Sequence, residues 1–213
     1  SENKEKIILG GGSNILFTKN LSDLVIYNQI KGINIIRETK QYVTIEVGGG
    51  ENWDDFVKWS TTRKLYGVEN LSLIPGSVGA APIQNIGAYG SEIKDSFIKL
   101  EAINLKTKEL CVFNKSECEF GYRKSIFKYD LKNQFIITKV YFKLFKYIKF
   151  NTNYKEVQNQ IENLESNQIN SQKIRNIIMN IRKKKLPNPR YIGNAGSFFK
   201  NPIFYCHVLC FLD

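Results

Sequence analysis

The sequence predicts a mixed α+β fold, and two features predict it. In the first half, short apolar or β-branched runs are separated by glycine-rich turns, which is typical of strands. In the last third, two stretches carry apolar residues at helical spacing. The 213 residues, 42% of them hydrophobic, can bury a substantial core as one large or two small domains.

Five strands are expected before the first helix, and Tyr42–Val47 is the clearest because Val43, Ile45 and Val47 alternate onto one face. The other four are Ile7–Leu9, Ile15–Phe17, Leu24–Tyr27 and Ile33–Ile36. Later strands are expected at Phe97–Leu105, Leu110–Phe113 and Phe135–Phe145, the last of which is rich in Ile, Val, Tyr and Phe.

The first helix is expected to begin after Asn52, a suitable N-cap, and to carry basic residues in its last turn. Two further helices are expected at Tyr154–Leu164 and Ser171–Lys185, and the second has an isoleucine stripe that runs from Ile174 to Ile181. Pro187 and Pro189 would end it.

The net charge of +11 would suit nucleic acid, but the lysines are scattered and no recognition motif is present. We therefore expect no nucleic-acid partner; a polyanionic dinucleotide or nucleotide sugar would gain equally from the positive field. The longest apolar stretch, Ile203–Leu212, is too short to span a bilayer, and Ser1–Lys6 does not resemble a signal peptide. A cytoplasmic protein without membrane contact is expected.

The cysteines favour neither a metal site nor a disulfide. Cys111, Cys118, Cys206 and Cys210 lack the C-x-x-C spacing of a metal knuckle. Cys206-His207 with Cys210 could form part of a metal site, but their apolar neighbours make buried thiols the simpler interpretation. We expect reduced thiols and no metal.

Two strands end in a glycine triplet followed by a polar residue and asparagine, Gly10–Asn14 and Gly48–Asn52. Backbone N–H groups of such a loop can converge on a phosphate because no side chain blocks the approach. Neither loop has the G-x-G-x-x-G spacing of a Rossmann fold, and taken alone such a motif is more often a tight turn than a nucleotide site.

The segment Ile74–Gly90 combines four glycines and two prolines with ordered apolar residues. That mixture is untypical of a disordered linker and suits a backbone pressed against a flat polar ligand. A loop buried between sheets is the alternative.

The motif Gly121–Ser125 places Tyr122 beside Arg123 after an expected strand. Arginine can stabilise a developing enolate or carboxylate charge, and tyrosine can hydrogen-bond a substrate. Surface display of both side chains is the alternative, and local sequence does not choose between them.

The motif Asn194–Pro202 sets Ser197 before two phenylalanines, which would exclude water around a proton donor. It lacks the G-x-S-x-G elbow, and the only histidine is His207, so hydrolase chemistry is not expected.

Together these segments resemble the UDP-N-acetylenolpyruvoylglucosamine reductase family, in its long-loop type. The matching pieces occur in family order: Leu9–Asn14, Val68–Leu71, Ile74–Gly90, Gly121–Lys128, Lys185–Pro187 and Gly193–Pro202. The resemblance implies a two-lobed FAD-binding fold of the vanillyl-alcohol-oxidase (PCMH) type over residues 1–148, with a break between lobes near 30–40. It also implies a helical segment at 149–186 that completes the FAD domain, and the start of a substrate domain at 187–213.

The resemblance also assigns roles. Arg123 would stabilise the enolate-like intermediate and Ser197 would donate the proton, while Tyr122, Tyr154, Lys185 and Asn201 would contact a nucleotide sugar. The implied FAD-binding residues are Gly10, Gly11, Gly12, Ser13, Asn14, Pro75, Gly76, Ser77, Gly79, Ala80, Pro82, Gln84, Asn85, Gly87, Ala88 and Tyr89.

The implied reaction is the NADPH-driven, FAD-dependent reduction of UDP-N-acetylglucosamine enolpyruvate in peptidoglycan synthesis, carried out by a monomer. The cofactor would do the redox chemistry while the protein orients and polarises the substrate. Another flavin oxidase of the same superfamily is opposed by the Tyr122-Arg123 and Ser197 motifs.

The chain departs from the family pattern at both ends, where we expect missing sequence. It reaches the first glycine loop within ten residues, and Ile203–Asp213 does not resemble the family, so no position can be assigned the family's C-terminal catalytic glutamate. A non-catalytic flavin- or nucleotide-binding remnant is therefore an alternative to an active enzyme.

Overall fold

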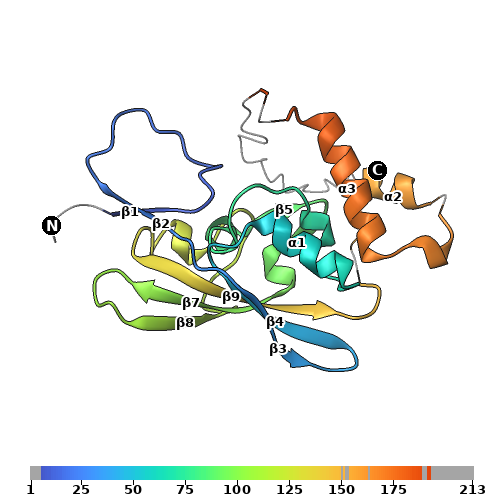
Figure 1. Ribbon diagram of the computed structural model, residues 1–213, viewed down its shortest axis with the longest axis horizontal. Coiled ribbons are helices and arrows are strands. Elements are labelled where there is room, and N and C mark those ends of the chain that lie inside the picture. The colour runs from blue at the N-terminus through green and yellow to red at the C-terminus, as the bar shows by residue number, and fades with distance from the viewer. Residues whose placement is uncertain (1–5, 150, 152–153, 163, 189–190, 193–213) are drawn as a thin grey trace, which may run out of the picture.

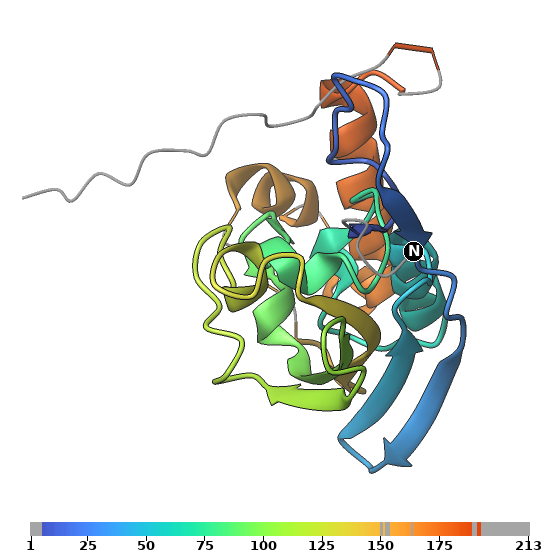
Figure 2. The ribbon, with the colours of Figure 1, turned by 90° about the vertical axis from the view of Figure 1, so that its left-hand side faces the viewer.

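The computed structural model describes residues 6–149, 151, 154–162, 164–188 and 191–192. A five-stranded antiparallel sheet, ordered β3-β4-β9-β7-β8, forms its centre, with α1 (Trp53–Thr62) packed on one face (Figure 1). The strands are β3 (Ile33–Glu38), β4 (Tyr42–Gly48), β7 (Phe97–Asn104), β8 (Leu110–Asn114) and β9 (Phe135–Phe145). Figure 2 shows the β3–β4 hairpin extending beyond the helices.

Strand β9 lies in the middle of the sheet and pairs with β4 and β7. Its β-branched and aromatic residues suit a strand with neighbours on both sides. The predicted bounds Phe135–Phe145 are confirmed, and so is the alternation of β4, where Val43, Ile45 and Val47 are all buried.

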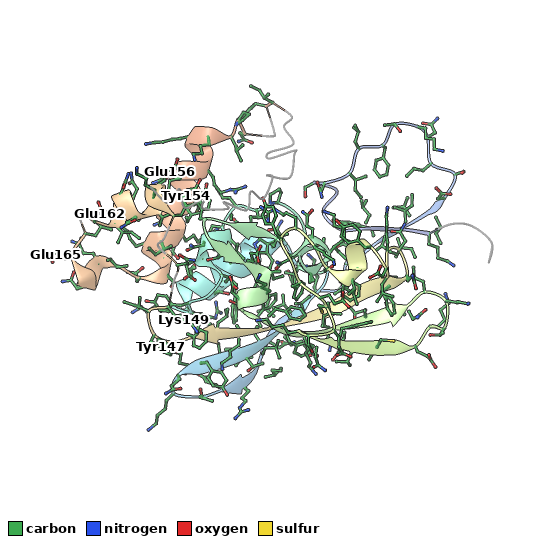
Figure 3. All side chains as sticks on the ribbon, turned by 180° about the vertical axis from the view of Figure 1, so that it is seen from behind. Tyr147, Lys149, Tyr154, Glu156, Glu162 and Glu165 are labelled. Atoms are coloured by element: carbon green, nitrogen blue, oxygen red, sulfur yellow. The ribbon has the colours of Figure 1, made fainter. Side chains whose placement is uncertain are left out.

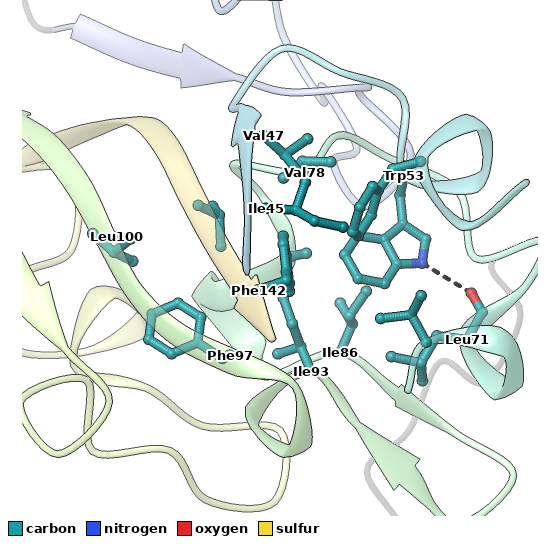
Figure 4. Packing of buried hydrophobic residues seen from close by; sticks show 14 of the residues in the cluster. Ile45, Val47, Trp53, Leu71, Val78, Ile86, Ile93, Phe97, Leu100 and Phe142 are labelled. Atoms are coloured by element: carbon teal, nitrogen blue, oxygen red, sulfur yellow. Dashed lines mark hydrogen bonds between the residues drawn. The ribbon is translucent and has the colours of Figure 1, made fainter. Parts of the chain in front are cut away.

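The main core lies between this sheet and α1 (Figure 4). Trp53 and Phe56 of α1 pack against Phe142 of β9 with ring centroids 6.0 and 4.8 Å apart, and all three side chains are fully buried. The Trp53 indole N–H donates to the Leu71 carbonyl oxygen at 2.9 Å. This bond satisfies the one polar atom of the indole and ties the core to the segment that precedes Ile74.

Helix α1 begins as predicted, because the Asn52 side chain accepts a hydrogen bond from the Asp55 N–H at 3.1 Å. It ends at Thr62, so Arg63 caps the helix instead of lying in its last turn as expected. The Arg63 guanidinium stacks over the Trp59 ring, 4.1 Å from the centroid.

A small parallel pair, β1 (Lys6–Leu9) and β2 (Leu24–Tyr27), lies apart from the five-stranded sheet. The strand expected at Ile15–Phe17 is wrong, because this segment pairs with no strand in the described part of the chain and all three residues are exposed. Asn28, directly after β2, joins the pair to the sheet by donating to the Ile137 carbonyl oxygen at 2.8 Å.

The second glycine triplet, Gly48–Gly50, is a packing element. A Cβ on Gly49 would lie 2.2 Å from the Ile137 carbonyl oxygen, and one on Gly48 would lie 2.4 Å from that of Ile30. Here the backbones of three segments meet at distances that only glycine permits. The repeated motif could be a phosphate-binding loop or a tight turn, and Gly48–Gly50 fits the tight turn.

Replacing Gly49 by alanine should therefore lower the free energy of unfolding by about 1–3 kcal/mol, because the backbone must shift to admit the methyl group. Urea denaturation followed by circular dichroism measures this. Gly121→Ala is the matched control, since the nearest atom to its added Cβ would be 3.5 Å away. Equal stability of the two variants would contradict the packing role of Gly49.

Two helices follow β9, at the upper right of Figure 1; the second packs on α1, and the first packs on the second. They are α2 (Lys155–Ile161) and α3 (Ser171–Lys185), of which α3 has the predicted bounds. Ile174, Ile177 and Ile178 of the predicted stripe are buried. The remaining short elements are β5 (Gly87–Ala88), β6 (Ser91–Glu92) and the 3₁₀ helices η1 (Glu69–Leu71), η2 (Ala81–Gln84), η3 (Ile93–Asp95), η4 (Ile126–Lys128) and η5 (Ser166–Gln168).

Among the described residues, no helix is both long and apolar enough to cross a membrane, and no His, Cys, Asp and Glu group has metal-site geometry. Cys111 and Cys118 are free thiols, and burial raises the pKa of Cys118 to about 12. Cys206, His207 and Cys210 lie outside the described residues.

Candidate functional site

The first glycine loop and the first half of Ile74–Gly90 form opposite walls of one cavity of about 380 Å³. This volume is in the range of small-molecule sites. The predicted FAD-binding residues on its walls are Gly10, Gly11, Gly12, Ser13, Asn14, Pro75, Gly76, Ser77, Gly79, Ala80 and Gln84. Two sequence segments about 60 residues apart, both singled out for their glycines, therefore meet in space.

The first glycine triplet has a different environment from the second. A Cβ on Gly10 would lie 2.6 Å from Ser77 Oγ, and one on Gly11 would lie 2.9 Å from Gly76 Cα, so two glycines allow the loop to touch the opposite wall. Gly12 has φ +69° and open space where its Cβ would be. The cavity thus reaches bare backbone at this point, as a site for a phosphate or a ring edge requires. A cavity with exposed backbone on its wall fits a flat dinucleotide.

Past Gln84, Ile86 is the one residue of the segment that still lines this cavity. Pro82, Asn85, Gly87, Ala88 and Tyr89, which the resemblance assigned to FAD, do not line it. Asn85 caps η2 in the left-handed conformation, with φ 45°, and Gly87, Ala88 and Tyr89 lie beyond this turn. The FAD role of these five residues stays a prediction.

The Asn85 side chain fixes this turn by hydrogen bonds to two other segments of the chain. Its side-chain amide donates to Glu92 Oε2 and to the Gly121 carbonyl oxygen, both at 2.9 Å, and its Oδ1 accepts from the Lys94 N–H at 3.2 Å. The contact with Gly121 brings the Tyr122-Arg123 motif to the second half of the segment.

Arg123 lies against that second half. Its Nη2 donates to the Gly87 carbonyl oxygen at 2.7 Å, and a Cβ on Gly87 would lie 3.1 Å from Nη1. Arg123 itself has φ +53°, an uncommon conformation for a residue with a side chain. The guanidinium lies 5.6 Å from the centroid of the Tyr122 ring. Surface display, the alternative at the sequence level, does not describe this half-buried arginine.

Tyr154, labelled in Figure 3, and Lys185 form a second group beside Tyr89, near the end of the segment. The Tyr154 ring packs edge-to-face on Tyr89 at 5.1 Å, and Lys185 Nζ lies 5.9 Å from the Tyr154 centroid. Lys185 also forms an ion pair with Glu156 at 2.6 Å, and the hydrogen bond from Lys185 to Glu156 raises the pKa of the lysine. Tyr89 therefore links the segment to two predicted substrate residues.

Of the remaining predicted site residues, Ser197 and Asn201 lie outside the described residues, so their roles stay predictions. Sequence reasoning missed several members of the cavity wall: Ile8, Asn28, Trp53, Phe127, Lys128, Leu131, Lys132 and Ile137. Lys128 is the last residue of the Gly121–Lys128 motif, and its place in that motif could have indicated that it belongs to the site. The others are scattered apolar or polar residues that no local pattern distinguishes.

Glu69 is a buried carboxyl beneath the segment, only 2% exposed. Burial raises its pKa to about 7, although its carboxyl oxygen accepts from the N–H groups of Gly67 at 2.6 Å and Val68 at 3.0 Å. Backbone donors satisfy the group, but in the described part of the chain no cation pairs with it.

This carboxyl predicts a pH-dependent stability. Between pH 4.5 and about 7 the folded state keeps the proton that the unfolded state releases, so the free energy of unfolding should fall as pH rises, by at most about 1.4 kcal/mol per pH unit. Glu69→Gln should flatten that slope, because a neutral amide titrates in neither state. Denaturation series from pH 4.5 to 7.5 measure it, and parallel curves for the two proteins would refute the assignment.

Comparison with known proteins agrees with this geometry. Residues 1–110 match the family described as FAD binding domain. The chain is 48% identical to UDP-N-acetylenolpyruvoylglucosamine reductase of Flavobacterium johnsoniae over 204 residues, covering 95% of the chain and 60% of that protein. It is also 48% identical to the protein of that name from Amoebophilus asiaticus over 198 residues, covering 93% and 58% respectively. The chain thus spans about three fifths of the length of these curated relatives.

A solved structure shares the fold. The crystal structure of UDP-N-acetylenolpyruvylglucosamine reductase (MurB) from Thermus caldophilus matches with a TM-score of 0.66 at 24% sequence identity, covering 94% of this chain and 62% of that one. The predicted α+β FAD-binding fold is confirmed. The predicted domain boundaries near 30–40, 148 and 186 stay predictions.

Proposed function

Because the chain belongs to the FAD binding domain family, we propose that it is the flavin-holding body of a UDP-N-acetylenolpyruvoylglucosamine reductase. The proposed reaction is the NADPH-driven reduction of UDP-N-acetylglucosamine enolpyruvate, a step of peptidoglycan synthesis. The proposed partner is this nucleotide sugar, bound by a monomer without nucleic acid or membrane. The net charge of +11 suits so polyanionic a substrate.

One observation carries the proposal: the segment Ile74–Gly90 has two functional sides. Its first half lines the cavity with the glycine loop, and the Gly87 carbonyl of its second half holds the Arg123 guanidinium. The residues that would hold the cofactor and the arginine that would hold the substrate are therefore positioned by one short segment. Hydride transfer needs the two bound molecules in direct contact, and neighbouring sites on one segment can provide that contact.

The residues of the chain would supply binding and charge. Bound FAD, after reduction by NADPH, would supply the hydride for the enolpyruvyl double bond. Arg123 would stabilise the negative charge that develops beside the substrate carboxylate, since a fixed cation in a partly buried site is effective there. Ser197 would donate the proton, and Tyr122, Tyr154, Lys185 and Asn201 would hold the nucleotide sugar.

Tyr89, against which Tyr154 packs, is itself held in place by hydrogen bonds. Its carbonyl oxygen accepts from the Asn70 side chain at 2.9 Å, and the same amide donates to the Asn151 carbonyl oxygen at 2.7 Å. The end of the segment is thus tied to the chain just before α2. A tyrosine ring and an ammonium group held side by side suit a diphosphate or sugar.

Flavin spectroscopy on the purified chain tests the proposal. We expect a yellow protein whose flavin absorbance bleaches with NADPH. In the absence of oxygen, the absorbance should recover only when UDP-N-acetylglucosamine enolpyruvate is added. Bleaching without substrate-dependent recovery would indicate the flavin-binding remnant and overturn the enzymatic proposal. A protein that takes up no FAD at all would overturn both.

A further inference from the structure

The cavity wall carries two cations among the described residues, Lys128 and Lys132, to which no role has been assigned. Lys128 ends η4, which follows the Tyr122-Arg123 motif directly. It is half-buried, whereas the side chain of Lys132 makes no hydrogen bond or ion pair within the described part of the chain. The two lysines therefore share a cavity but differ in what they touch.

Helix η4 is firmly anchored beside the cavity. The Ser125 hydroxyl donates to the Ile83 carbonyl oxygen of η2 at 2.7 Å, which fastens η4 to the first half of the Ile74–Gly90 segment. Phe127 is buried and packs edge-to-face against Phe113 at 5.0 Å. The backbone that carries Lys128 is thus held from two sides.

Lys128 connects the cavity to Arg123. Its Nζ donates to the Arg123 carbonyl oxygen at 3.2 Å, at the residue whose backbone has φ +53°. The same turn closes through paired backbone hydrogen bonds between Gly121 and Lys124, at 3.0 and 3.1 Å. A contact to this carbonyl stabilises an unfavourable backbone conformation, and that conformation aims the guanidinium at Gly87.

We propose that Lys128 is a positioning residue that couples FAD in the cavity to the placement of the Arg123 guanidinium. The inference rests on the proposed function. An ammonium group has three donors, and one is used on the Arg123 carbonyl, so the others can serve a cofactor oxygen at the cavity wall. FAD binding then immobilises Lys128 and, through it, the turn that carries Arg123. By linkage, substrate held at Arg123 also strengthens FAD binding.

The test compares Lys128→Met with the matched control Lys132→Met in the full chain. FAD affinity is measured by flavin fluorescence, and substrate affinity by the change in flavin absorbance when UDP-N-acetylglucosamine enolpyruvate is added without NADPH at saturating FAD. Both variants should bind FAD more weakly. Lys128→Met alone should also weaken substrate binding about tenfold, as expected for losing one hydrogen bond to a charged donor. Lys128→Arg should restore most of it.

A double-mutant cycle with Arg123→Met separates this role from general structural damage. If Lys128 acts through Arg123, the double variant binds substrate no more weakly than Arg123→Met alone. The inference would be overturned, and the proposed function left intact, by either of two results. One is that the losses of substrate affinity from Lys128→Met and Arg123→Met multiply in the double variant, and the other is that Lys128→Met and Lys132→Met bind substrate equally well. Failure of the unchanged chain to bind FAD would overturn the proposed function, and the inference with it.

Discussion

Replacing Arg123 by methionine should lower the rate of substrate-dependent flavin reoxidation by about 10²–10³-fold, the usual effect of removing one group that stabilises transition-state charge. The structure gives this arginine its importance: its guanidinium is fixed on the Gly87 carbonyl at the second half of the segment whose first half lines the cavity. Methionine keeps the length of the side chain but removes the charge and the donors.

The control for this variant is its reaction with NADPH. The Arg123 side chain does not line the cavity, so FAD binding and reduction of the flavin by NADPH should stay within about threefold of the unchanged chain. Stopped-flow absorbance measures both half-reactions separately. Unimpaired reoxidation, or loss of FAD binding, would contradict the role assigned to Arg123.

Replacing Arg175 by methionine should lower the free energy of unfolding by about 3 kcal/mol. Arg175 lies on α3, and its side chain is 4% exposed. It forms a bidentate pair with Asp54 of α1, at 2.6 and 2.7 Å, and Asp54 Oδ1 also accepts from the Leu73 N–H at 2.6 Å. Burial alone would raise the pKa of Asp54, but the hydrogen bonds from Arg175 and Leu73 outweigh it and lower the pKa.

This value is at the lower end of the range for breaking a buried pair, because Asp54 is a quarter exposed and keeps its bond to Leu73. The matched control is Lys146→Met, which removes an exposed ion pair with Glu38 and should cost less than about 1 kcal/mol. Urea unfolding of the three proteins at pH 7 measures both values. Equal costs for the two substitutions would contradict the inferred importance of the buried pair.

The Asp54–Arg175 pair also has a functional consequence. Helix α3 carries Arg175 in its second turn and Lys185 at its end, and Leu73 immediately precedes the segment Ile74–Gly90. One carboxylate therefore joins α1, α3 and the start of the site. We expect Arg175→Met to weaken the alignment of Lys185 with Tyr154 before it disturbs the main sheet.

The sequence was most informative where local pattern decides structure. The alternation of β4, the apolar run of β9, the N-cap of α1 and the isoleucine stripe of α3 each have a direct physical cause, and each was predicted. Ile15–Phe17 had an equally apolar pattern but has no partner strand among the described residues, and composition cannot show a partner. A strand needs a neighbour to satisfy its backbone groups.

The two glycine triplets show the same limit within the site. Their sequences are almost identical, yet Gly48–Gly50 lies packed against Ile30 and Ile137, whereas Gly12 opens onto the cavity. Only the neighbours supplied by distant parts of the chain distinguish the two roles. The position of Gly87 beside Arg123 likewise follows the left-handed turn at Asn85, which sequence alone does not specify.

The central claim is that the cavity between residues 10–14 and 75–84 holds FAD. A crystal structure of the chain grown with FAD tests it most directly. The account predicts electron density for one cofactor in that cavity, in contact with the open backbone at Gly12 and with Lys128 on the wall. FAD bound elsewhere on the chain, with this cavity empty, would contradict it.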